Sequence, residues 1–120
     1  MRLVVMLALL ATVLGAGCSK TRKTSVSDTL PGRQVYEVKN CTRCHGVDAE
    51  GGTSAPSLRF IGHRLSKEQI VEFLKDPALY TQKDARLAGQ AGKYPTRMPG
   101  FPFMAPADLE RLAEYLLALN

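Results

Sequence analysis

Residues 40–46 read Asn-Cys-Thr-Arg-Cys-His-Gly, with two cysteines three positions apart and a histidine directly after the second. Four kinds of site use closely spaced cysteines: a disulfide, a zinc site, a redox dithiol and a covalent haem attachment. The rest of the chain helps to decide between them, because each kind of site needs different further residues or a different local fold.

Haem attachment is the kind of site that the rest of the chain favours. A redox dithiol normally follows a strand of a βαβ unit, and no such pattern surrounds Cys41. A structural zinc ion needs four ligands. His63 is the one other good candidate for such a ligand, since Cys18 belongs to a separate amino-terminal segment. A plain disulfide leaves the adjacent histidine without a role. Haem attachment uses Cys41, Cys44 and His45 together, as two thioethers and an iron ligand.

The amino-terminal residues have the order of a secretory signal. Arg2 gives a positive start, residues 3–14 form an almost unbroken apolar run, and residues 15–17 are small. This order of charged, apolar and small residues is typical of signal peptides. A transmembrane helix needs about 20 apolar residues, and this run is shorter. We expect residues 1–17 to be removed from an exported protein.

Cys18 follows a stretch, Leu14-Gly15-Ala16-Gly17, that resembles the lipobox of bacterial lipoproteins, with its leucine one position earlier than usual. The resemblance implies that Cys18 becomes the mature amino terminus and receives a diacylglyceryl group. The chain has three cysteines, and an odd thiol in an exported protein needs an explanation. Two acyl chains suffice for stable membrane attachment. We expect a lipid-anchored protein of the cell envelope, with residues 18–30 as a polar tether.

The charge of the chain excludes few partners but makes nucleic acid an unexpected one. The formal net charge is +5, and removal of Arg2 with the signal peptide lowers it by one. No basic run is long enough to indicate nucleic-acid binding. The remaining positive charge fits either steering toward an acidic partner or an ordinary solvated surface.

The hydrophobic pattern predicts an all-α domain over residues 31–120 with three main helices and long loops. The first helix opens at Pro31-Gly32 and runs toward Cys41; its apolar contacts are expected to be Val35, Tyr36 and Val38. The sequence contains no strand pair with hairpin chemistry and no internal repeat.

The second and third helices have clear start signals. Ser66 and Gln69 form a capping box before an apolar stripe, and Asp76-Pro77 stops the helix. Pro106 begins the last helix, because proline is favoured in a first turn. The two expected apolar faces are made of Ile70, Val71, Phe73 and Leu74, and of Leu109, Leu112, Ala113, Tyr115 and Leu116.

Loops are expected at residues 46–62 and 78–104, the second with at most short helical turns, because both are rich in glycine and proline. A domain of this size with three short helices buries little apolar surface. A loop of such length is also unusual without a function. A large apolar group at the centre resolves both difficulties.

With these features the chain resembles the class I c-type cytochromes, the small bacterial proteins with a single haem. The resemblance covers roughly residues 31–119. It rests on these segments in chain order: Gly32 with Tyr36, Cys41-Thr42-Arg43-Cys44-His45-Gly46, Ala55-Pro56-Ser57-Leu58, Asp76-Pro77, Thr96-Arg97-Met98-Pro99 and Leu112-Ala113-Glu114-Tyr115-Leu116.

The resemblance implies the cytochrome c fold, wrapped around one covalent haem c. The first and last helices should cross, so that Gly32 and Tyr36 meet Leu112 and Tyr115. The family also implies that the carbonyl of Pro56 accepts a hydrogen bond from the histidine ligand, which orients the ring.

The second axial ligand of the iron has three candidates: Met98, Met104 and His63. The family places its methionine ligand in the loop before the last helix, followed by proline, and Met98 occupies that place. Met104 is expected to pack in the core and His63 to be exposed. The residues that could surround the haem or bond its propionates are Arg59, Arg64, Tyr94 and Arg97.

The implied function is electron transfer rather than catalysis. An iron with His45 and Met98 on its two sides has no open position for a substrate, and a thioether ligand raises its potential. We expect a membrane-tethered electron carrier of a bacterial respiratory or related chain, with redox proteins as transient partners. Two alternatives remain: a haem c subunit of a larger oxidoreductase complex, and a haem sensor or peroxidase with a labile sixth ligand.

Overall fold

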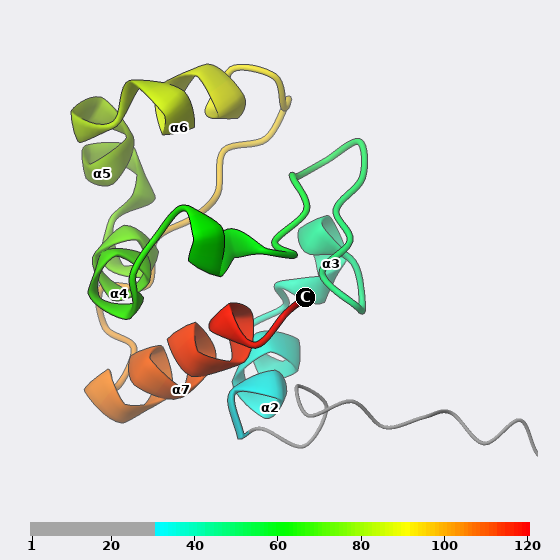
Figure 1. Ribbon diagram of the computed structural model, residues 1–120, viewed down its shortest axis with the longest axis vertical. Coiled ribbons are helices and arrows are strands. Elements are labelled where there is room, and N and C mark those ends of the chain that lie inside the picture. Colours follow the sequence, from blue (N-terminus) through cyan, green and yellow to red (C-terminus); the bar gives the residue numbers. More distant parts are fainter. Residues whose placement is uncertain (1–30) are drawn as a thin grey trace, which may run out of the picture.

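The computed structural model describes residues 31–120; the expected signal peptide, Cys18 and the tether lie outside the described residues. Within this range the chain forms six α-helices, a short 3-10 turn and no strand, so the all-α prediction is confirmed (Figure 1). The elements are α2 (Pro31–Val38), α3 (Thr42–His45), η1 (Ile61–His63), α4 (Lys67–Lys75), α5 (Pro77–Lys83), α6 (Ala85–Ala91) and α7 (Pro106–Leu117). No helix of the described part combines the length and the apolar character needed to span a bilayer.

Helices α2 and α7 cross in close contact at the lower side of the molecule in Figure 1. The crossing point is Gly32: an ideal Cβ placed there would lie 1.9 Å from the carbonyl oxygen of Arg111 and 2.6 Å from Cβ of Tyr115. The rings of Tyr36 and Tyr115 pack with their centroids 5.3 Å apart. Only glycine permits this approach, and the expected meeting of the first and last helices is confirmed.

One apolar side chain of α2 does not reach the core. The sequence pattern counted Val38 among the apolar contacts, but this side chain is 68% exposed. Two positions along an α-helix correspond to about 200° of rotation. Because Tyr36 faces α7, Val38 must point to the opposite side, so its predicted burial was wrong.

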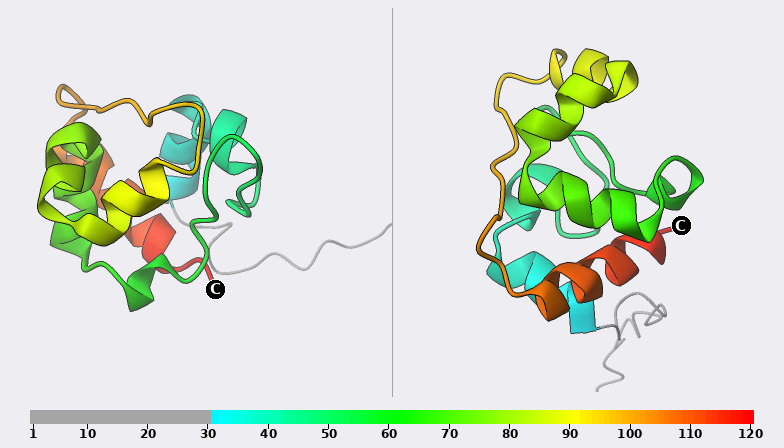
Figure 2. Two further views of the ribbon diagram at one scale, coloured as in Figure 1. Left: turned by 90° about the horizontal axis from the view of Figure 1, so that it is seen from above. Right: turned by 90° about the vertical axis from the view of Figure 1, so that its left-hand side faces the viewer.

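Helix α4 packs against α7, and Figure 2 shows the two helices side by side. The amino-terminal end of α4 is capped by side chains. Its capping box is present: Gln69 N donates to Ser66 Oγ and Ser66 N donates to Gln69 Oε1. Lys67 Nζ lies 3.2 Å from Glu110 and 2.8 Å from Glu114, which joins the polar sides of α4 and α7. The buried side chains between the helices form one cluster, whose larger members are Tyr36, Leu65, Ile70, Leu74, Met104, Leu109, Leu112, Tyr115 and Leu116.

Two helices, α5 and α6, occupy most of residues 77–91, whereas the sequence predicted a loop with at most short turns over residues 78–104. Each has an aspartate at its start: Asp76 accepts from Leu79 N at 2.9 Å, and Asp84 accepts from Arg86 N at 2.9 Å. From the sequence, Asp76-Pro77 was expected only to end α4, whereas the same pair also caps and opens α5. The remaining irregular segment, residues 92–105, descends from α6 to α7 (Figure 1; Figure 2, right).

Candidate functional site

The two cysteines and the histidine are placed by a sharp change of direction after α2. Asn40 has a left-handed backbone with φ of 60°, which asparagine tolerates better than most residues. Cys41 then precedes the single turn of α3, which ends at His45. The hydroxyl of Tyr36 donates to the carbonyl of Gly46 at 2.7 Å, which ties the motif to α2.

The imidazole of His45 is buried and has a defined partner. Its side chain is 6% exposed, and Nδ1 lies 2.8 Å from the carbonyl oxygen of Pro56. A carbonyl oxygen can only accept, so Nδ1 carries the proton and Nε2 keeps its lone pair in the neutral ring. Burial lowers the pKa of His45, while the hydrogen bond to Pro56 acts the other way. The ring is therefore held neutral, in the tautomer that leaves Nε2 available to a metal.

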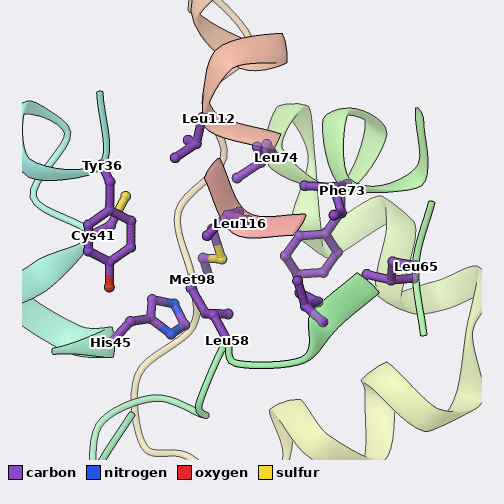
Figure 3. A pocket seen from close by; sticks show the side chains of 12 residues that line it. Tyr36, Cys41, His45, Leu58, Leu65, Phe73, Leu74, Met98, Leu112 and Leu116 are labelled. Atoms are coloured by element: carbon purple, nitrogen blue, oxygen red, sulfur yellow. The ribbon is translucent and has the colours of Figure 1, made fainter. Parts of the chain in front are cut away.

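An apolar cavity lies beside this ring (Figure 3). Binding sites for cofactors usually have mainly apolar walls with a few well-placed polar groups. Twelve residues line it: Tyr36, Cys41, His45, Leu58, Ile61, Leu65, Ile70, Phe73, Leu74, Met98, Leu112 and Leu116. The cavity thus combines apolar walls with one thiol, one imidazole and one thioether, a donor set that fits covalent haem.

The structure separates the three candidates for the second axial ligand. Met98 lines the cavity together with His45, although the two residues lie far apart in sequence (Figure 3). Met104 is buried in the core cluster and does not line the cavity. His63 is exposed, with its ring 5.8 Å from that of Phe60. Met98 is therefore the one candidate of the three that shares a cavity with His45.

Burial also sets the ionisation of the other groups around the motif. It raises the pKa of the Cys41 thiol to about 11, chiefly by desolvation. Desolvation likewise raises the pKa of Tyr36 above its ordinary value. Both groups therefore stay neutral near pH 7 and add no charge beside the motif.

The residues expected around a haem are not brought to the cavity wall. The guanidinium of Arg59 donates to the carbonyl oxygen of Asn120. Tyr94 is partly buried and Arg97 exposed, and neither lines the cavity. Arg64 is also exposed and away from the lining. Their contacts with propionates stay predictions.

Several wall residues were not singled out from the sequence as parts of a site. Leu58, Ile61, Leu65 and Phe73 come from the loop before α4 and from α4 itself. Ile61 and Leu65 flank the stretch 62–64, and Phe73 belongs to the apolar stripe of α4, so their sequence signal was apolar character alone. The hydroxyl of Tyr36, which holds the motif through Gly46, was also missed, because the sequence reading treated this residue as core only.

Comparison with known proteins independently supports a cytochrome c domain. A family model described as cytochrome c matches residues 30–120. Cytochrome c oxidase subunit 2 of Alkalihalophilus pseudofirmus is 29% identical over 97 residues, which cover 74% of this chain and 25% of that protein. Cytochrome c550 of Pseudomonas aeruginosa is 35% identical over 72 residues, covering 55% of this chain and 49% of that protein. The chain thus spans only a quarter to a half of the length of these relatives. No solved structure matches it significantly.

The range of the family match covers the segments that line the site. The matched range contains the whole described domain, including the cysteine–histidine motif and the segment that brings Met98 to the cavity. The apolar cavity and its donor set fit the cofactor of the family. The chain therefore belongs to the cytochrome c family, as a single-haem class I domain with one covalent haem c.

Proposed function

We propose that this protein is a single-haem electron carrier that is tethered to a bacterial membrane. The observation that carries the proposal is that His45 and Met98 line the same apolar cavity. Two such ligands would leave no iron position open to a substrate. A closed site of this kind favours electron exchange over chemistry on a bound molecule.

The roles of the residues follow from their chemistry. When bound, the haem iron supplies a one-electron couple between its ferrous and ferric states. Cys41 and Cys44 would hold the cofactor through thioethers. The carbonyl of Pro56 fixes the ring of His45 and raises its basicity as a ligand. The thioether of Met98 would raise the potential.

The cavity walls have a separate role in this proposal. Apolar side chains such as Leu58, Leu74 and Leu116 line the cavity with His45 and Met98 and would keep water from the iron. A packed apolar wall rearranges little when a neighbouring charge changes, because it holds few mobile dipoles. Fast electron exchange with a transient partner requires this small rearrangement, and contacts of that kind are usually small.

The tether is the finer part of the proposal and rests on the sequence alone. The lipobox-like stretch before Cys18 and the odd number of cysteines support lipidation. A polar linker of 13 residues has a root-mean-square reach of about 20 Å. It would keep the domain beside membrane-bound redox partners and raise its effective concentration there.

A second candidate function is favoured by one comparison. Cytochrome c oxidase subunit 2 of Alkalihalophilus pseudofirmus aligns over 74% of this chain. This similarity supports a fixed haem subunit of a larger oxidoreductase as the alternative. Purification in mild detergent separates the two functions, because a subunit stays with its complex whereas a carrier elutes alone.

The ligand set is tested by matched substitutions that keep side-chain volume and remove the thioether, Met98→Leu and Met104→Leu. In the reduced protein Met98→Leu should admit carbon monoxide and lower the potential. Met104→Leu should leave coordination unchanged, because Met104 only packs in the core. Visible spectroscopy with carbon monoxide, together with redox titration, measures both effects.

Other outcomes of this test identify other sites. If Met104→Leu opens the site instead, Met104 is the ligand. If only His63→Ala alters coordination, the iron has two histidine ligands. If the unmutated reduced protein binds carbon monoxide rapidly, the sixth iron position is open, and a haem sensor or peroxidase becomes the better interpretation.

The anchor is tested separately by intact-mass spectrometry of protein extracted from membranes. The mature chain should begin at Cys18 and carry acyl chains. Cys18→Ser should give soluble exported protein or unprocessed precursor. An unmodified thiol at Cys18 in the membrane-extracted protein would rule out the lipid anchor while leaving the electron carrier intact.

A further inference from the structure

The segment after Met98 is docked closely onto the corner between α4 and α5. An ideal Cβ on Gly100 would lie 2.7 Å from the carbonyl oxygen of Lys75 and 3.1 Å from Cδ of Pro77. The backbone of this segment therefore packs directly against the corner, where no side chain fits. The next residue fixes the contact, because Phe101 N donates to the carbonyl of Leu74 at 2.8 Å.

The corner itself is a firm support at the edge of the cavity. Leu74 is buried and lines the cavity with Met98. Asp76 caps α5 by accepting from Leu79 N at 2.9 Å. Pro77 is buried at the first turn of α5, where its ring restricts the backbone. The corner fixes the position of the segment that packs against it. The corner is itself held in place because α4 packs on the core through Ile70 and Leu74.

We propose that Gly100 is a positioning residue for Met98. Gly100 allows the backbone to contact the corner, and this contact determines the position of the Met98 thioether in the cavity. A Cβ at Gly100 must displace either the segment or the corner by several tenths of an ångström. Since the corner is held by the core, the segment moves and carries Met98 with it. The inference rests on the proposed function, in which Met98 is the iron ligand.

The test compares Gly100→Ala with Gly89→Ala in the full-length haem protein. Gly89 lies in α6, and a Cβ there meets nothing within 4 Å, so it is a matched control for the same substitution. The probe is imidazole, which competes with Met98 for ferric iron. Gly100→Ala should raise the affinity for imidazole by about tenfold or more, the scale of one overpacked methyl group. It should also weaken the ferric charge-transfer absorption of the iron–thioether bond. Gly89→Ala should change the affinity less than about twofold.

A second background separates positioning from a general loss of structure. In Met98→Leu protein the same Gly100→Ala substitution should leave the affinity for imidazole unchanged, because the thioether is already absent. The inference is overturned if Gly100→Ala raises the affinity for imidazole equally in the unmodified protein and in Met98→Leu. It is also overturned if neither protein carrying Gly100→Ala retains haem, because both results show a structural role only. An unchanged affinity for imidazole in Gly100→Ala alone would also overturn it while the proposed function stands. If Met98→Leu itself does not raise the affinity, the proposed function and the inference fall together.

Discussion

Two hydrogen bonds to backbone carbonyls hold His45 and the residue that follows it. The carbonyl of Pro56 accepts from its ring, and the hydroxyl of Tyr36 holds the following residue, Gly46. Neither contact adds a charge beside the iron position. The tuning of this site at the scale of single residues is therefore expected to come from burial and orientation, with the thioether of Met98 as the main variable.

The residue that most strictly controls packing is Gly32. Alanine there would bring Cβ to 1.9 Å from the carbonyl oxygen of Arg111 and force α2 away from α7. We expect Gly32→Ala to lower the free energy of unfolding by about 1–3 kcal/mol, as overpacking does. Alanine's better helix propensity, about 1 kcal/mol, offsets only part of the loss.

Denaturant unfolding of the haem protein measures this change, with Gly89→Ala as the control in an open helical position. The control should be neutral or slightly stabilising. Equal stability of Gly32→Ala and the unmodified protein would show that the two helices do not need their close approach.

At the scale of elements, α6 differs from the longer helices because it does not contribute to the core. No residue of α6 is buried, and this helix packs mainly against α5. Its start depends on Asp84, which accepts from Arg86 N and Leu87 N. The hydrogen bond to the side chain of Arg86 lowers the pKa of Asp84, so the carboxylate remains charged near neutral pH.

Removal of this cap should loosen α6 without unfolding the domain. Asp84→Ala should reduce the hydrogen-exchange protection of the α6 amides while changing global stability by at most about 1 kcal/mol. Asp108→Ala is a suitable control, since Asp108 lies in the first turn of α7 and pairs with Arg111 without capping the helix. Loss of protection across α4 and α7 as well would contradict the independence of α6.

The sequence predicted those elements whose signals are local. The capping box of α4, the proline at the start of α7 and the haem motif each lie within a few residues. The shorter α5 and α6 were missed because proline and glycine were counted as helix breakers. Pro77 in fact occupies a favoured first-turn position, and α6 accommodates Gly89.

The choice of Met98 over Met104 could not follow from residue type, because the two methionines are only six positions apart. The resemblance favoured Met98 by its place before proline. In the fold, the two are separated where Phe101 N bonds to the carbonyl of Leu74, a contact between segments distant in sequence. Such contacts decide which side chain reaches a cavity and which one fills the core.

At the scale of the whole molecule, the fold encloses its cavity with few helices. The walls come from α2, the haem motif, the segment before α4, α4 itself, α7 and the segment carrying Met98 (Figure 3). A small domain built in this way buries limited apolar surface of its own. The bound haem would complete the core and stabilise the native state as any tightly bound ligand does.

Removal of the cofactor should therefore unfold the domain. Replacement of both Cys41 and Cys44 by alanine should leave a chain of low helicity that proteases degrade readily. Far-ultraviolet circular dichroism and a thermal scan measure the outcome. A cooperative thermal transition in the haem-free chain would show that its own core is sufficient.

The central claim is that His45 and Met98 close the iron site from two sides of one cavity. X-ray absorption at the iron K-edge of the purified haem protein tests this claim most directly, because it reports the atoms bound to the metal. The account predicts one sulfur ligand in both the oxidised and the reduced protein, absent in Met98→Leu and retained in Met104→Leu. A shell of nitrogen and oxygen alone, or five-coordinate reduced iron, would contradict it.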